Sequence, residues 1–158
     1  MTQQSATTTA AGKRYVRPKN LSDVIANRIV SCLSGLGISV WGSRVLAVRG
    51  RKSGEWRTTP VNVLSHRGAR YLVAPRGHTQ WVRNIRATPV AELRLGGRAE
   101  VFTAAELADT AKPEILRAYL RRWKFEVGMF FDGVDHTASD EELLRIAPGY
   151  PVFRIIEQ

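Results

Sequence analysis

The sequence predicts an α+β fold: a small antiparallel β-barrel or β-roll with flanking helices. Short apolar or β-branched segments alternate with tight turns that contain glycine, as in small all-β frameworks. Helical patterns are inserted between these segments at a few places only. The regular strand–helix alternation of a βαβ dinucleotide-binding fold is absent. A chain of 158 residues is long enough to bury a core around such a framework.

The strand signals follow one another from residue 45 onward. Residues 45–48 form a short apolar strand, 56–64 a second and 71–74 a third. Pro60 lies inside the second and cannot donate a ladder hydrogen bond, so it predicts an edge position or a bulge. Two Gly residues between 90–95 and 98–103 predict a two-residue hairpin, and 152–156 forms the final strand.

Four segments carry helical signals. Apolar residues recur at three- and four-residue steps in 21–36. Thr79 caps a short helix that ends before Pro89. A third helix begins near residue 109, has a proline in its first turn and reaches about residue 124, and a fourth covers 140–146.

The N-terminal region consists mainly of residues with small or polar side chains. We expect residues 1–15 to be a disordered tail and residues 16–158 to form a single domain. The 21–36 helix is expected to pack on that domain. The alternative is a peripheral contact with a membrane surface, next to the basic residues at 13–19.

Composition excludes several classes of protein. Cys32 is the only cysteine and the three histidines are far apart, so no internal disulfide and no local metal motif is expected. No apolar run approaches the ~20 residues that span a bilayer. We therefore expect a cytoplasmic protein, or one at the inner face of the membrane, without a bound metal.

Positive charge is concentrated in the first part of the chain. The net charge is +10, with +14 on residues 1–99 and −4 on residues 100–158. The stretch 44–86 holds ten basic residues and one acidic residue. Such a field attracts an anionic partner: a nucleic acid, an anionic membrane or a phosphorylated or carboxylated small molecule. A basic surface without a specific partner is the plain alternative.

The loop at residues 49–54, with Arg57 after it, is the first candidate site. Its glycines allow exposed backbone amides, and Arg51, Lys52 and Ser53 add cationic and hydroxyl donors for a phosphate or carboxylate. It is not a Walker A loop, because Arg51 stands where that motif needs glycine. A solvated hairpin turn is the alternative.

Two further segments are candidates. Trp81 and Asn84 are three residues apart, so on a helix they share a face that can hold a planar ring, and His78 just before them is a candidate general acid. An exposed histidine and a core tryptophan are the alternatives. The aromatic segment 123–131 is either core or an apolar pocket wall. No pattern of a nucleophilic or zinc hydrolase is visible.

These motifs resemble those of the deazaflavin (F420)-dependent nitroreductase family. The similarity lies in Gly50-Arg51-Lys52-Ser53-Gly54 with Arg57 and Pro60, then in Tyr71-Leu72-Val73-Ala74 with Arg76 and Gly77. It continues through Trp81, Asn84, Ala87 and Pro89-Val90, and covers about residues 40–105. The resemblance implies a split β-barrel, antiparallel and related to FMN-binding barrels. It also implies coenzyme F420, whose phosphate and oligoglutamate tail suit a cationic groove.

The resemblance also implies a role for individual residues. Arg51, Lys52 and Ser53 match the phosphate loop, and Arg57 and Arg76 match basic positions near the anionic tail. Pro60, Val73 and Ala74 match backbone beside the deazaflavin, and Trp81 and Asn84 match the supporting helix. We place the substrate pocket at Asn62, Phe125, Met129, Phe130 and Phe131. Asn62 stands where the nitroimidazole-reducing member has a tyrosine, and Pro75 to His78 replace a family Ser–Lys–Gly–Gly run.

The expected function is hydride transfer from reduced F420 to an electron-poor small molecule, namely an enone, a quinone or a nitro compound. The cofactor carries the hydride, so no catalytic triad is required. No nucleic-acid partner is expected, and a homodimer is compatible with the fold. The alternatives are a basic nucleic-acid-binding β-barrel and a related barrel that uses flavin or binds haem or another tetrapyrrole.

Overall fold

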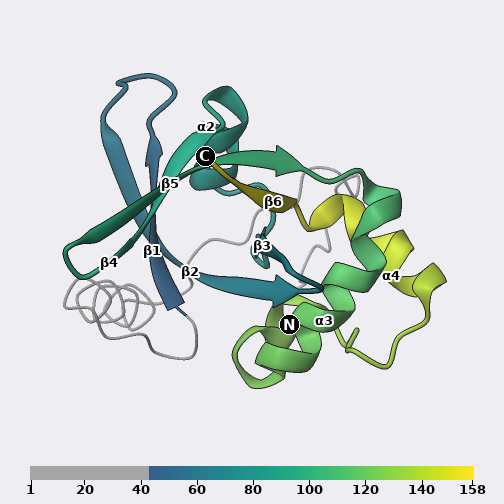
Figure 1. Cartoon of the computed structure of the whole chain (residues 1–158). Coiled ribbons are helices and arrows are strands. Elements are labelled where there is room, and N and C mark those ends of the chain that lie inside the picture. The colour runs from purple at the N-terminus through teal and green to yellow at the C-terminus, as the bar shows by residue number, and fades with distance from the viewer. Residues whose placement is uncertain (1–42) are drawn as a thin grey trace, which may run out of the picture.

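The computed structural model describes residues 43–158, and these form a six-stranded antiparallel barrel with three helices (Figure 1). The strands are β1 (Ser43–Arg49), β2 (Trp56–His66), β3 (Ala69–Val73), β4 (Val90–Leu95), β5 (Arg98–Glu106) and β6 (Val152–Glu157). Their order around the barrel is β1-β2-β3-β6-β5-β4, with β4 pairing back to β1. The predicted tail at 1–15 and helix at 21–36, with the membrane contact expected of that helix, lie outside the described residues.

The strand signals correspond closely to the observed strands. The hairpin turn between β4 and β5 falls on Gly96 and Gly97, and Gly96 has a positive φ of 60°. β6 pairs with both β3 and β5, although about half of the chain separates it from β3. The barrel is thus closed by contacts that join distant parts of the sequence.

β2 has a different neighbour in each half, and we name residues 56–62 its edge half because no β3 residue pairs with them. Residues 56–62 pair with β1, whereas pairing with β3 begins only at Val63. Pro60 lies in the half that pairs with β1 alone, opposite Val45, so its missing N–H removes no bond of the β2–β3 ladder. The proline therefore has the edge position that the sequence predicts.

The helices are α2 (Gln80–Ala87), α3 (Lys112–Val127) and α4 (Asp140–Ile146). α3 and α4 lie together on one side of the barrel, and α2 lies apart from them (Figure 1). Ser139 caps α4 by accepting a hydrogen bond from the Glu142 amide. α3 has a kink at Trp123, where φ is −119° and ψ is 29°. In the described part of the chain, no helix is long and apolar enough to cross a membrane.

Two hydrophobic core clusters both contain residues of the barrel strands. One fills the barrel and is closed by α2 through Val82 and Ile85, which pack with Leu46, Phe102 and other barrel residues. The second lies between the barrel and the α3–α4 pair and includes Leu116, Leu120, Phe131 and Tyr150 among its members. α2 is therefore fixed at the barrel, beside the edge half of β2.

Candidate functional site

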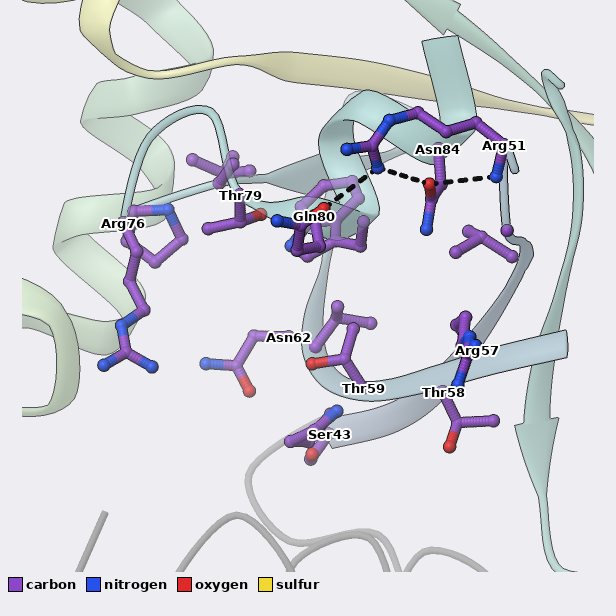
Figure 2. Close-up of a pocket in the computed structure, with 18 of the residues that line it drawn as sticks. Ser43, Arg51, Arg57, Thr58, Thr59, Asn62, Arg76, Thr79, Gln80 and Asn84 are labelled. Carbon is purple, nitrogen blue, oxygen red and sulfur yellow. Dashed lines mark hydrogen bonds between the residues drawn. The ribbon is translucent and has the colours of Figure 1, made fainter. Parts of the chain in front are cut away.

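A cavity of about 840 Å³ opens between the edge half of β2, the loop after β1 and helix α2 (Figure 2). Its wall includes the unbroken run from Arg57 to Asn62, which is the half of β2 without a β3 neighbour. The loop that joins β3 to α2 forms another part of the wall, and α3 contributes Tyr119 and Val127. The volume is in the range of small-molecule and cofactor sites.

The ten residues predicted to bind the cofactor all line this one cavity: Arg51, Lys52, Ser53, Arg57, Pro60, Val73, Ala74, Arg76, Trp81 and Asn84. Three separate stretches of sequence therefore meet at one place. Their individual roles in binding stay predictions.

The charged side chains on the described cavity wall all have the same sign. Among its described lining residues, Arg51, Lys52, Arg57 and Arg76 are cationic and none is acidic. Arg76 lies on the opposite side of the cavity from Arg51 (Figure 2). Arg57 is paired with Glu55 at 3.6 Å, but both side chains are exposed, so this ion pair is weak. The cavity therefore suits an anion or a ligand with several anionic groups.

The loop after β1 is a tight turn docked on α2. The Gly54 amide donates to the Gly50 carbonyl at 2.8 Å, and Gly54 has a φ of +71°. A Cβ on Gly50 would come within 2.9 Å of Ser53 Oγ, so any side chain there would displace the Ser53 hydroxyl. The Arg51 amide and Nη1 both donate to Asn84 Oδ1, at 3.2 and 2.9 Å.

Arg51 also donates through Nη1 to Gln80 Oε1 at 2.9 Å (Figure 2). Asn84 is 5% exposed, so it is a buried acceptor on α2 that fixes both the backbone and the side chain of Arg51. The side-chain oxygens of Gln80 and Asn84 accept from Arg51 Nη1, and the guanidinium keeps further N–H groups for a ligand. Sequence reasoning singled out Arg51 and Asn84 separately but did not connect them.

Two polar atoms on the cavity wall are buried without a partner. Arg76 Nε and Thr79 Oγ1 make no hydrogen bond within the described residues. Both belong to the loop between β3 and α2, and both residues line the cavity. Buried donors of this kind are normally satisfied. Together with the cationic loop, they fit a ligand that carries anionic or carbonyl oxygens, as F420 does.

The predicted catalytic candidate His78 is not part of the cavity. Its Nε2 donates to the Pro148 carbonyl at 3.1 Å, and Nδ1 accepts from Arg86 Nη1 at 2.9 Å. Burial and the neighbouring Arg86 cation lower the pKa of His78. Both ring nitrogens are used and the ring lies outside the cavity lining, so the structure does not bring His78 together with the cofactor-binding candidates, and its role as general acid stays a prediction.

The structure does not bring the predicted aromatic substrate wall into this cavity, and its role stays a prediction. Phe125 and Met129 are 94% and 75% exposed, and neither lines the cavity. Phe131 is buried in the core, where it stacks on Tyr150 with ring centroids 4.2 Å apart. Phe130 packs against that core and does not line the cavity. The Arg76 guanidinium carbon lies over its ring, 5.5 Å from the ring centroid. The kink at Trp123 turns this segment, so a straight-helix face cannot be read from its spacing.

Asn62 is the one residue of the predicted substrate set that lines the cavity. Its Nδ2 donates to Glu126 Oε2 at 3.2 Å. Tyr119, which sequence reasoning missed, lines the same cavity. No local motif marks Tyr119, because it is one of several apolar-face positions on α3.

Comparison with solved structures places this barrel in a defined fold class. An F420-H2-dependent reductase, FDR-A, superimposes with a TM-score of 0.50 at 19% identity, over 72% of this chain and 93% of its own. A protein described as a domain-swapped dimer gives a TM-score of 0.55 at 17% identity, over 86% and 99%. The haem storage protein HutZ from Vibrio cholerae gives 0.52 at 9% identity, over 74% and 82%. The chain has the split β-barrel fold, which does not by itself select a cofactor.

The match to a protein-family model identifies the cofactor. Residues 26–129 match the F420H2-dependent quinone reductase family, and the chain belongs to that family. None of the curated proteins matches the sequence significantly. The protein is thus an F420H2-dependent reductase with reduced F420 as its cofactor. This confirms the predicted deazaflavin chemistry, while the matched family is described by quinone reduction and not by nitroreduction.

Proposed function

We propose that this enzyme reduces a quinone, with F420 held in the cavity between β2 and α2. The observation that carries the assignment of the site is the cavity itself. Its described wall combines four cationic side chains, no acidic one and two unpartnered buried polar atoms. The family description supports the quinone as acceptor. An enone or a nitro compound is a weaker candidate.

In this proposal the chain binds and orients a cofactor that, when bound, supplies the hydride. Arg51, Lys52 and Ser53 hold its phosphate, on a loop that Asn84 fixes to α2. Arg57 and Arg76 interact with the anionic tail. The wall formed by Pro60, Val73, Ala74 and Trp81 packs on the ring and excludes water.

Two measurements test the site and the function separately. Titration of the protein with F420 and with FMN is expected to show much tighter binding of F420. Oxidation of reduced F420 is then followed with a water-soluble quinone, an enone and a nitroarene as acceptors. We expect the quinone to be reduced fastest. Equal binding of FMN would remove the proposed site, and oxidation by no quinone would remove the proposed acceptor.

A double variant connects the site to the binding. Arg51→Ala with Lys52→Ala should weaken F420 binding at least tenfold, at about 1.5–3 kcal/mol for each charge-assisted contact. The matched control is Arg98→Ala with Arg121→Ala, which also removes two exposed cations but outside this cavity. An equal loss in both variants would mean that only net charge matters.

A homodimer is supported by the neighbour described as a domain-swapped dimer. Light scattering on the purified full chain tests it. A mass of one chain across the working concentrations would contradict it.

A further inference from the structure

The barrel has a second cavity, at the end opposite helix α2. β1 and β3 begin at this end and finish at loops that line the cavity between β2 and α2, whereas β4 begins after α2 and finishes here. The volume of this barrel-end cavity is about 520 Å³. Among the described residues, its charged wall consists of Arg44, Arg70, Arg98, Arg122 and Glu100, and none of these lines the cavity between β2 and α2.

Three of these arginines lie on the inward face of their strands. Side chains two residues apart on a strand point to the same face. Arg44 and Arg70 each stand two residues before a leucine of the cluster that fills the barrel, and Arg98 stands four residues before a phenylalanine of that cluster. Charged side chains are rarely turned toward a barrel interior unless they have a partner there. The strand pattern therefore indicates that this end of the barrel is built to receive negative charge.

The glutamate on the wall accounts for one of the arginines. Arg70 Nη1 donates to Glu100 Oε2 at 3.0 Å, and Arg70 Nη2 donates to Glu100 Oε1. The same Nη2 also donates to Glu157 Oε1 at 2.8 Å. Within the described residues, neither Arg98 nor Arg122 has an ion pair. These two cations therefore line the cavity without a compensating carboxylate from its described wall.

The cations reach the cavity from different elements. Arg44 lies on β1, Arg98 on β5 and Arg122 on α3. Arg44 also donates through Nη1 to the Ser43 carbonyl at 3.0 Å. The terminal oxygens of a phosphate point in several directions, whereas the two oxygens of a carboxylate lie in one plane. Guanidinium groups that approach from separate sides therefore match a phosphate better than a single carboxylate.

We propose that the barrel-end cavity is a second anion site, which binds a phosphate-bearing small molecule through Arg98 and Arg122. Arg44 and the Ser65 hydroxyl add further donors on the wall. The carboxylate of Glu100 is held by two hydrogen bonds from Arg70, which limits its repulsion of the ligand. The site is separate from the cavity between β2 and α2, so the inference goes beyond F420-dependent reduction and does not rest on it.

The probe for this site is pyrophosphate, titrated into protein that is already saturated with F420. Saturation is needed because the cavity between β2 and α2 is cationic as well and would take up the same probe. Calorimetry at constant ionic strength should show binding of pyrophosphate to the F420-saturated protein. Arg98→Ala with Arg122→Ala should raise its dissociation constant at least about tenfold, because two charge-assisted contacts are lost. The dissociation constant of F420 should stay within roughly twofold of the wild-type value.

Arg121→Ala with Lys124→Ala is the matched control. Both side chains are exposed on α3 and line neither cavity. This variant lowers the net charge by the same amount and should leave pyrophosphate binding nearly unchanged. Pyrophosphate should also raise the midpoint of thermal unfolding of the wild type and of this control, but not of the Arg98→Ala, Arg122→Ala variant. An equal loss of binding in both double variants would show a response to net charge only and would overturn the site.

Succinate distinguishes a phosphate site from a site for any small anion. It carries two carboxylates and should bind the F420-saturated protein at least about tenfold more weakly than pyrophosphate. Equal binding of the two anions would overturn the assignment of a phosphate. If F420-saturated wild type binds no pyrophosphate, the whole inference is overturned, and the proposed quinone reduction stands.

Discussion

Asn84 shows how one buried amide can organise a charged loop. Its side-chain oxygen accepts from both the backbone and the guanidinium of Arg51, 33 positions earlier in the sequence. An asparagine inside a short helix is unfavourable for local structure, since its side chain competes for backbone hydrogen bonds. Here it provides a neutral acceptor, which holds Arg51 without neutralising its charge.

Replacing Asn84 should therefore affect the loop more than the helix. Asn84→Ala leaves the Arg51 amide without its acceptor and should weaken F420 binding about tenfold, the scale of one hydrogen bond to a charged group. Isothermal titration measures this. Gln80→Ala, which removes a single exposed contact with Arg51, is the control and should cost clearly less. Equal losses would show that the shared acceptor at Asn84 has no special role.

His78 makes stability depend on pH in a defined direction. Its folded-state pKa is lowered by burial and by Arg86, so the unfolded chain binds the proton more tightly. The contribution to stability is complete above the unfolded pKa, about 6.5. It is lost as the pH falls from there through the lowered folded-state pKa.

The free energy of unfolding should thus decrease from pH 7 toward pH 5 in the wild type and decrease less in His78→Gln. Urea unfolding at several pH values measures both slopes. Between pH 7.5 and 8.5 the two proteins should show the same slope. A wild-type slope that is unchanged in His78→Gln would assign the effect to another group.

At the scale of elements, the boundaries were largely predictable and the contacts were not. Turn glycines and Pro89 are local signals, and the strands and helices begin and end close to them. The role of the segment after Trp123 cannot be predicted from its sequence, because aromatic residues look alike whether they fill a core or face a ligand. Phe125 and Phe131, six residues apart, lie at the two extremes of exposure.

The contrast in exposure between Phe125 and Phe131 gives a prediction for these two residues. Phe131→Ala should destabilise the protein by about 3–5 kcal/mol, because it empties a fully buried site against Tyr150. Phe125→Ala should change the free energy of unfolding by less than about 0.5 kcal/mol, since the ring is exposed. Denaturant unfolding measures both. If Phe131→Ala instead changed acceptor preference with stability intact, this segment would be part of the pocket after all.

The cavity residues also differ in whether the sequence predicts them. All ten proposed cofactor contacts come from segments that carry recognisable motifs, so sequence alone collected them. Tyr119 comes from a helix whose pattern is ordinary, and it reaches the cavity only because α3 packs on the barrel. A residue whose role depends on tertiary packing leaves no mark at a fixed sequence spacing.

For the whole molecule, the concentration of cations predicts a strong effect of ionic strength. F420 binding should weaken as salt is raised, because exposed charges are screened over about 8–10 Å at 0.1–0.15 M salt. The Arg51→Ala, Lys52→Ala variant should show a shallower dependence of the dissociation constant on salt. Titrations at three salt concentrations measure this. Parallel lines for both proteins would mean that the loop does not contact the anionic part of the cofactor.

The edge half of β2 has a consequence for how a ligand can be recognised. Along residues 57–62, every second main-chain amide and carbonyl points away from β1, toward a side where no β3 residue is paired. A ligand recognised by such groups depends on the path of the strand, so we expect substitutions of the uncharged side chains here to weaken binding less than loss of the cationic ones. Barrels that share only 9–19% of their residues with this chain keep the same architecture. In the proposed site, the path of the strand would therefore matter more for the cofactor than the uncharged side chains along it.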